Sequence, residues 1–168
     1  MFRTTTLILL FILFSLILLA ASACGGQVSS FKNTSSVTAK QTTINAQVNG
    51  DYVSIPLSDV EKNLNSRFQV KTAKGQLSFM SYKFDNQLYV RADICPPCGS
   101  ESFTLTNGTL VCDSCGTVFN AKNGAGVRGA CVNYPKAAVS FEIKDGNIVM
   151  KDTDLVSAFQ NTLKPQKS

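Results

Sequence analysis

Hydrophobic and polar residues alternate over short stretches between residues 48 and 150, a pattern typical of β-strands with one buried face. The stretches that alternate, or are rich in Val, Ile, Phe and Tyr, are residues 52–55, 67–72, 76–84, 87–94, 103–105, 109–111, 139–143 and 148–150. Turn residues separate several of them, and Asn107-Gly108 is a strong signal for a tight hairpin. The pattern therefore predicts a mainly β domain.

Two segments instead follow the period of an α-helix. Residues 58–64 are expected to form a short helix capped by their first residue, a serine, with Glu61 completing a capping box. In residues 154–163 the apolar positions recur at steps of three and four, and Asp152 or Thr153 is the expected cap. This second segment predicts a short C-terminal helix that packs on the sheet.

The N-terminal segment, residues 1–23, has a different pattern. Arg3 precedes an apolar run that extends to Ala21 and ends at the small-residue sequence Ala21-Ser22-Ala23, followed by Cys24. This arrangement is typical of an export signal. Residues 21–24 are also similar to a bacterial lipobox, in which Cys24 would be lipidated. Ordinary secretion after Ala23 is one alternative. Another is a short uncleaved membrane anchor, since the run is shorter than the roughly twenty residues of a spanning helix.

All three interpretations place the rest of the chain on the extracytoplasmic side of the cell membrane. Residues 24–45 are rich in Ser, Thr, Gly, Asn and Gln, which favours a flexible linker. Residues 46–168 have the length of one domain. We therefore expect a signal peptide or anchor, a linker, and a single domain tethered to the membrane.

Charge and composition narrow the classes of function. The 168 residues include 16 basic and 11 acidic side chains, a net charge of +5, and the basic residues form no cluster, so the sequence gives no support for nucleic-acid binding. There is no histidine, which excludes a histidine-dependent triad, and there is no phosphate-binding glycine loop before a helix. The composition therefore gives little support for a hydrolase or a transferase.

Two cysteine knuckles carry the candidate chemistry. They are Cys95-Pro96-Pro97-Cys98-Gly99 and Cys112-Asp113-Ser114-Cys115-Gly116, separated by the predicted hairpin. Each knuckle presents two sulfurs from one turn, and the hairpin brings the two turns side by side, which gives the four donors of a tetrahedral site. The spacing alone fits a [2Fe–2S] cluster, a Zn²⁺ ion or a single iron ion equally well.

Four thiolates leave negative charge on any of these centres, and N–H groups or cations must offset it. Gly99 and Gly116 make donation by backbone N–H groups sterically easy, and the Thr117 hydroxyl is placed to donate to a sulfur. Candidate cations are Arg91, Lys122 and Arg128. For each of these side chains, a solvated surface position is the competing interpretation.

The sequence from the second knuckle onward resembles the second half of a Rieske-type domain. The matching pieces are residues 110–120, which contain the knuckle and Phe119, and Gly129-Ala130-Cys131 in the loop that would lie over a cluster. Both histidine positions of the Rieske pattern are cysteines here, so a centre with two histidine ligands is excluded. Cys131 becomes a fifth candidate ligand.

Residues 50–150 resemble more closely the FtrD-like family of membrane-associated iron–sulfur proteins, which is linked to a bacterial ferrous-iron uptake system. The resemblance rests on residues 53–60, 91–98, 112–119 and 129–131. It implies a small Rieske-like β domain with rubredoxin-type knuckles, a [2Fe–2S] cluster on Cys95, Cys98, Cys112 and Cys115, and single-electron transfer to or from a redox or iron-transport partner.

Two alternatives stay open at this stage. A Zn²⁺ ion at the knuckles would stabilise a binding domain without any redox function. Thiol–disulfide exchange by an unmetallated Cys-x-x-Cys is less favoured, because such motifs lie at a helix N-terminus and both knuckles are predicted between strands.

Overall fold

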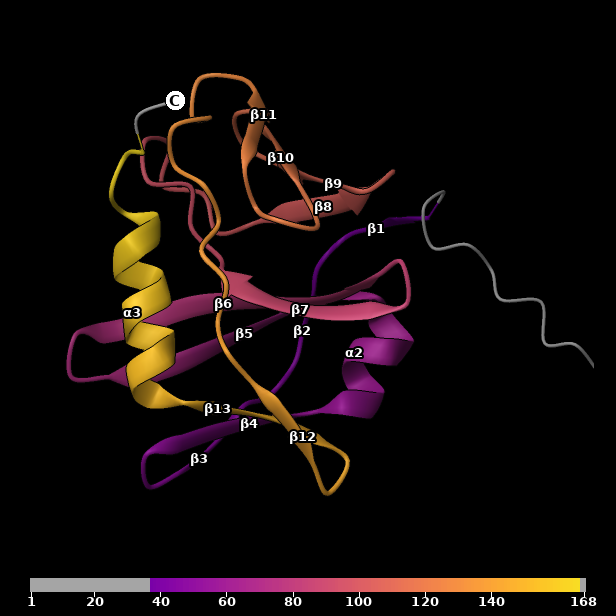
Figure 1. The fold of residues 1–168 in the computed structure, drawn as a ribbon, viewed down its shortest axis with the longest axis vertical. Coiled ribbons are helices and arrows are strands. Elements are labelled where there is room, and N and C mark those ends of the chain that lie inside the picture. The colour runs from indigo at the N-terminus through magenta and orange to yellow at the C-terminus, as the bar shows by residue number, and fades with distance from the viewer. Residues whose placement is uncertain (1–36, 167–168) are drawn as a thin grey trace, which may run out of the picture. The chain divides into compact units, whose positions relative to one another are not determined.

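The computed structural model describes residues 37–166, which fold into three β-sheets and two helices (Figure 1). The predicted export or anchor segment, most of the predicted linker and Cys24 lie outside the described residues. Within this range, no helix is both long enough and apolar enough to span a membrane. The prediction of a mainly β domain with a short C-terminal helix is confirmed.

The three sheets are stacked, and the central one is formed, in spatial order, by β2 (Thr42–Thr43), β5 (Asn65–Thr72), β6 (Gly75–Phe84) and β7 (Gln87–Ala92). The sheet that carries the knuckles contains β1 (Thr38–Ala39), β8 (Phe103–Thr106), β9 (Thr109–Cys112), β10 (Val118–Asn120) and β11 (Gly126–Arg128). The third sheet contains β12 (Glu142–Lys144), β13 (Asn147–Lys151), β4 (Tyr52–Pro56) and β3 (Gln47–Asn49). The helices are α2 (Leu57–Asn63) and α3 (Asp152–Thr162).

Strand β6 contributes to two hydrophobic cores, because alternate side chains of a strand point to opposite faces. Leu77 and Phe79 belong to the core shared with the third sheet and α3. Met80, Tyr82 and Phe84 belong to the core that contains the buried cysteines of the knuckle sheet. The central sheet thus lies between both cores and supports the cysteine region from below in the view of Figure 1.

The predicted tight turns are present. Asp85 and Asn86 have φ values of 51° and 59° between β6 and β7, and Asn107 and Gly108 have φ values of 47° and 73° between β8 and β9. Two consecutive residues with positive φ are the signature of the hairpin turn that matches strand twist. The second turn returns the chain from the first knuckle to the second.

Both predicted helix caps are wrong. Helix α2 begins after Pro56 and α3 after Lys151, in each case without a side-chain cap. Each helix directly follows a strand, and neighbouring backbone satisfies the first N–H group: Leu57 N donates to Gly146 O and Asp152 N to Asp51 O. A polar cap is therefore not needed at these positions.

The folded region extends further toward the N-terminus than the sequence suggested. Strand β1 pairs with β8, β2 runs parallel to β5, and Ile44 is buried. The last part of the predicted linker, residues 37–45, is consequently part of the β structure. Its few apolar residues gave no periodic signal, because each of these strands contains only two residues.

The long segment between β11 and β12 is fixed to the central sheet by Arg91. This buried guanidinium donates to Tyr82 Oη at 2.8 Å, to the carbonyl of Lys136 at 2.8 Å and to the carbonyl of Lys122 at 2.6 Å. The backbone of Gly124 lies against the same segment, since Lys136 N donates to Gly124 O. Arg91 therefore clamps two loops together rather than acting as a solvated cation.

We expect Gly124→Ala to be strongly destabilising. Gly124 has a φ of 76°, and a Cβ there would overlap the Lys136 carbonyl oxygen and Arg91 Nη1. Gly146→Ala is the matched control, since Gly146 has a φ of 74° but open space where the added methyl group would lie. The control should lose about 1–2 kcal/mol from backbone strain. Gly124→Ala should lose about 1–3 kcal/mol more from overpacking, measured by denaturant unfolding. Equal losses would contradict this account.

Candidate metal centre

Both cysteine knuckles adopt the same type of turn. In the first, Cys98 N and Gly99 N donate to Cys95 O at 3.1 and 2.8 Å, and in the second, Gly116 N donates to Cys112 O at 2.9 Å. The glycines have φ values of 70° and 69°, a conformation that disfavours other residues. The glycine N–H groups thus close the turns on carbonyl oxygens, whereas we expected them to face the sulfurs.

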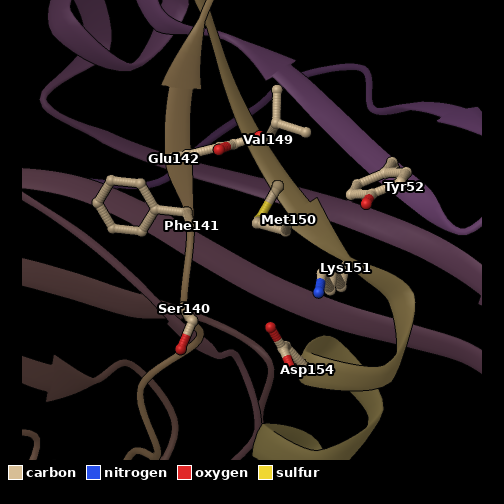
Figure 2. A pocket seen from close by; sticks show the side chains of 8 residues that line it. All are labelled: Tyr52, Ser140, Phe141, Glu142, Val149, Met150, Lys151 and Asp154. Carbon is tan, nitrogen blue, oxygen red and sulfur yellow. The ribbon is translucent and has the colours of Figure 1, made fainter.

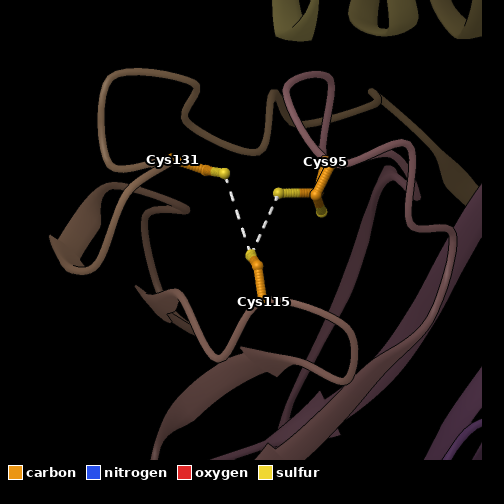
Figure 3. Close-up of side chains that lie close together, drawn as sticks. Cys95, Cys115 and Cys131 are labelled. Atoms are coloured by element: carbon orange, nitrogen blue, oxygen red, sulfur yellow. Dashed lines mark hydrogen bonds between the residues drawn. The ribbon is translucent and has the colours of Figure 1, made fainter.

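The structure brings four cysteine sulfurs into one group, which contains three of the predicted knuckle ligands and Cys131. The fourth predicted ligand, Cys112, is not part of this group and lies beside it. The Sγ atoms of Cys95, Cys98, Cys115 and Cys131 all lie within 4.8 Å of one another. Cys112 Sγ lies 3.7 Å from Cys98 Sγ. Figure 3 shows Cys115 between Cys95 and Cys131, with sulfur–sulfur distances of 3.9 and 3.8 Å. All five are free thiols in this structure.

These distances fit metal coordination by thiolates. Four sulfurs at about 2.3 Å from a tetrahedral ion are separated by about 3.8 Å, close to the three shortest distances here. The same separation applies to the two cysteine sulfurs bound to each iron of a cluster, since each iron is tetrahedral. The donors are all soft thiolates, which suit iron–sulfur clusters and zinc and are poor ligands for Mg²⁺ or Ca²⁺.

The cluster has a buried side and an exposed edge. Cys95, Cys112 and Cys131 are buried, whereas Cys98 and Cys115 are exposed. In each knuckle the first cysteine therefore points inward and the second reaches the surface. A metal centre held there would be accessible from one direction.

Thr117 links Cys115 to Cys131, in agreement with the expectation that its hydroxyl reaches a sulfur. Its Oγ1 lies 3.2 Å from Cys115 Sγ and accepts a hydrogen bond from Cys131 N at 3.2 Å. A hydroxyl can accept from the N–H group while it donates to a thiolate. The side chain is fully buried, so water cannot replace either contact.

The thiols have very different proton affinities. Burial raises the pKa of Cys95, the adjacent Cys131 and Cys98 raise it further, and the positive charge of Lys136 opposes them. Burial also raises the pKa of Cys112, against hydrogen bonds from the Cys115 N–H, Ser100 and the Ser114 N–H. At Cys115, burial raises the pKa, but hydrogen bonds from Thr117, Cys112 and Cys98 outweigh it and lower the value to about 6. Metal binding at this site therefore releases protons from the buried thiols.

An aspartate within the second knuckle fixes that turn to β8. The Asp113 carboxylate accepts hydrogen bonds from Ser102 Oγ at 2.5 Å and Thr104 Oγ1 at 2.7 Å, and Asp113 N donates to Ser102 O. Sequence analysis did not predict that Asp113 fixes the turn, because acidic residues are dispersed along the chain and no motif distinguishes this one. The contacts hold the second knuckle in position without using a sulfur.

The three cations expected near the sulfurs have other surroundings, and a buried lysine that was not predicted lies near the cysteines instead. Lys122 is exposed and pairs with Asp85 at 2.6 Å, Arg128 is exposed on β11, and Arg91 clamps the loops as described above. Lys136 is buried in the same core as three of the cysteines, and sequence analysis missed it. No motif marks this residue, because its segment has no periodic pattern.

One hollow lies on another part of the fold. Figure 2 shows some of its lining residues, and its volume is about 420 Å³ between β12, β13 and the start of α3. Tyr52, Phe141, Lys151 and Asp154 are among the lining residues, and none of the cysteines is. The third sheet and the knuckle sheet lie at opposite ends of the stack (Figure 1). The hollow is therefore separate from the cysteine cluster.

Comparison with protein families gives one match that covers most of the described domain. The model of the family described as "Membrane iron-sulfur containing protein FtrD-like" matches residues 60–161. The matched range contains Cys95, Cys98, Cys112, Cys115 and Cys131, and it confirms the family resemblance found in the sequence. No curated protein sequence matches the chain.

Solved structures share the fold at low sequence identity. One is a chain from the complex of reduced oxygenase and oxidised ferredoxin in carbazole 1,9a-dioxygenase, with a TM-score of 0.51 and 20% identity over 62% of this chain and 95% of that chain. Another is the plasma membrane Rieske protein of the cyanobacterium Synechocystis, with a TM-score of 0.43 and 19% identity over 57% of this chain and 94% of that chain. The first of these confirms a Rieske-like fold.

We expect Thr117→Val to destabilise the protein. Valine keeps the shape of threonine but leaves the buried Cys131 N–H without its acceptor, which costs about 1–3 kcal/mol. Thr117→Ser is the matched control, because it keeps the hydroxyl and loses only a methyl group. Denaturant unfolding of both variants at equal metal content measures the difference. A Thr117→Ser protein that is less stable than Thr117→Val would show that packing, not the hydrogen bond, matters here.

Proposed function

This chain belongs to the FtrD-like family of membrane iron–sulfur proteins, and we propose that it is a membrane-tethered single-electron carrier on the extracytoplasmic side. In this proposal, Cys95, Cys98, Cys112 and Cys115 hold a [2Fe–2S] cluster, which supplies a site that accepts or releases one electron. The observation that supports it most is the group of four mutually close sulfurs, with Cys112 beside them and two of the sulfurs exposed, in a Rieske-like fold.

The protein residues define how such a carrier would work. One electron arrives from a reduced partner protein and leaves to an oxidised one, with no bond made or broken in the chain. The exposed sulfurs of Cys98 and Cys115 offer the shortest path to a partner surface. The buried sulfurs of Cys95 and Cys112 lie against the hydrophobic core, which excludes water and lowers structural rearrangement during transfer.

Four of the five cysteines are assigned as ligands because the two knuckles are equivalent. Each has the same Cys-x-x-Cys-Gly backbone turn, with an inner and an outer sulfur. Cys131 comes from a separate loop and lacks this turn. On that ground we assign Cys131 as a fifth thiol beside the centre and Cys112 as a ligand, although the four mutually close sulfurs include Cys131 and not Cys112.

The cellular setting of the proposal comes from the N-terminal sequence and the family. Ala21-Ser22-Ala23-Cys24 is similar to a lipobox, and the family description names a membrane protein. Lipidation of Cys24, or an uncleaved N-terminal anchor, would tether the domain to the membrane. The partner is then a redox or iron-transport protein at the same membrane, in keeping with the iron-uptake system to which the family resemblance pointed.

A structural zinc site is the second candidate function, and the mutual closeness of four sulfurs is the observation that supports it. The sulfurs of Cys95, Cys98, Cys115 and Cys131 fit a single tetrahedral ion as well as sulfurs at this spacing fit a cluster. Thiol–disulfide exchange is less well supported. Its two sulfurs would come from one Cys-x-x-Cys motif at a helix N-terminus, whereas both knuckles here are turns that no helix follows.

The first test is the content of the centre in wild-type protein purified without oxygen. We expect about two irons and two acid-labile sulfides per chain, a visible absorption spectrum, and loss of the visible bands after one-electron reduction. One zinc per chain without visible absorption would overturn the redox proposal and establish the structural alternative. One iron without sulfide would make the centre mononuclear.

The ligand assignment is tested by two serine variants. Cys112→Ser should lose most of the bound metal and have a lower free energy of unfolding, because only three of the four assigned thiolate ligands remain. Cys131→Ser should keep the metal content and the spectrum of the wild type. Both cysteines are buried, so the pair controls for the loss of a buried sulfur. The reverse result, with metal lost only from Cys131→Ser, would assign Cys131 as a ligand in place of Cys112.

A further inference from the structure

Lys136 places a positive charge in the hydrophobic core beside the cysteines. The residue is only 1% exposed. Its Nζ donates to the carbonyl of Ile94 at 2.5 Å and lies 4.4 Å from the ring centroid of Phe119 and 5.2 Å from that of Phe103. Ile94 directly precedes the first knuckle, and Phe103 pairs across the strands with Cys112. The ammonium group therefore contacts residues that adjoin both knuckles.

No carboxylate neutralises this charge in the described part of the chain. The salt bridges found there are Lys83–Glu61 and Lys122–Asp85, and neither involves Lys136. Asp93 is the acid whose charge acts on Lys136. Its own carboxyl is buried, its pKa is raised to about 7 by that burial, and its hydrogen bonds come from Gln41 and Ser78. Asp93 is therefore a weak partner for the lysine.

The cysteines are the stronger source of negative charge. Burial lowers the pKa of Lys136, and the groups that oppose this lowering are, in decreasing order, Cys95, Cys112, Cys131 and Asp93. An isolated buried ammonium is unfavourable, and a cation–π contact or a single carbonyl offsets only part of the cost. The burial of Lys136 is energetically reasonable when thiolates beside it are ionised, as they are when they bind a metal.

The position of Lys136 is fixed by the same contacts that join the loops. Arg91 donates to its carbonyl, and its own N–H group donates to Gly124 O at 2.8 Å. The backbone therefore cannot move to carry the ammonium group out to solvent without breaking buried hydrogen bonds. These contacts with Arg91 and Gly124 involve protein atoms alone.

We propose that Lys136 is the internal counter-ion of the cysteine centre, a positioning residue whose buried ammonium group offsets negative charge on metal-bound thiolates. The electron-transfer part of this inference rests on the proposed function. The charge-compensation part applies to any metal bound by four thiolates, because zinc and an oxidised [2Fe–2S] core each leave two uncompensated negative charges. A positive charge at this site stabilises the bound metal and favours the reduced, more negative state.

The test compares Lys136→Met with Lys122→Met in the full chain. Both substitutions remove one positive charge and keep an unbranched side chain, but Lys122 is exposed and already paired with Asp85. Two quantities are measured on metal-containing protein: the midpoint reduction potential, and the half-time of metal release to a chelator. Lys136→Arg, which keeps the charge, tests for rescue. If Lys136→Met yields no folded protein, Lys136→Gln replaces it.

We expect Lys136→Met to disfavour reduction at least tenfold, a shift of 59 mV to lower potential for a one-electron couple. Metal release should become at least tenfold faster. Lys122→Met should match the wild type in both, and Lys136→Arg should restore most of the potential. Equal potentials and release rates in Lys136→Met and Lys122→Met would overturn the inference.

The same measurements separate failure of this inference from failure of the proposed function. If the wild type contains zinc, the electron-transfer proposal fails, and the release half-time alone decides the role of Lys136. If the wild type contains a redox-active cluster and Lys136→Met leaves its potential and its release half-time unchanged, the proposed function stands and the counter-ion inference fails.

Discussion

The close packing of cysteine sulfurs sets the main physical constraint on this protein: four lie within 4.8 Å of one another, and Cys112 Sγ lies 3.7 Å from Cys98 Sγ. Ionised thiolates repel each other at this distance, and the repulsion is strong in a region of low dielectric. The arrangement is therefore stable only when the sulfurs are protonated or when positive charge lies among them. The buried side favours protonation, whereas the Thr117 contact favours a thiolate at Cys115. A bound metal resolves this conflict at the sulfurs that bind it.

The rest of the fold holds the sulfurs close despite that repulsion. The β8–β9 hairpin sets the separation of the knuckles, and Asp113 ties the second turn to β8. The loop that carries Cys131 is bound to the central sheet through Arg91. Because β6 belongs to both hydrophobic cores, the geometry of the cysteines also depends on packing at the far side of the central sheet.

Residues that act through local spacing could be predicted from the sequence. The knuckles, both hairpin turns and the C-terminal helix follow from patterns over a few residues, and the Thr117 contact follows from its place after Cys115. The helix caps could not be predicted, because turns between neighbouring strands provide the acceptors. The approach of Cys131 to the other sulfurs was expected only from the family resemblance. The position of Lys136 depends on how a long irregular loop returns to the sheet, and no periodicity encodes that path.

Because the sequence contains no histidine, a centre bound by four cysteines carries negative charge that a cation such as Lys136 can offset. An oxidised [2Fe–2S] core with two thiolates and two neutral imidazoles has no net charge, whereas four thiolates leave two negative charges. Replacing histidine by cysteine at both outer positions therefore makes reduction less favourable. One buried ammonium beside the inner sulfurs offsets half of that added charge, at a distance from solvent where screening by salt is weak. In the proposed carrier, an all-cysteine ligand set is combined with an internal cation, and the balance between the two would set the potential that a partner meets.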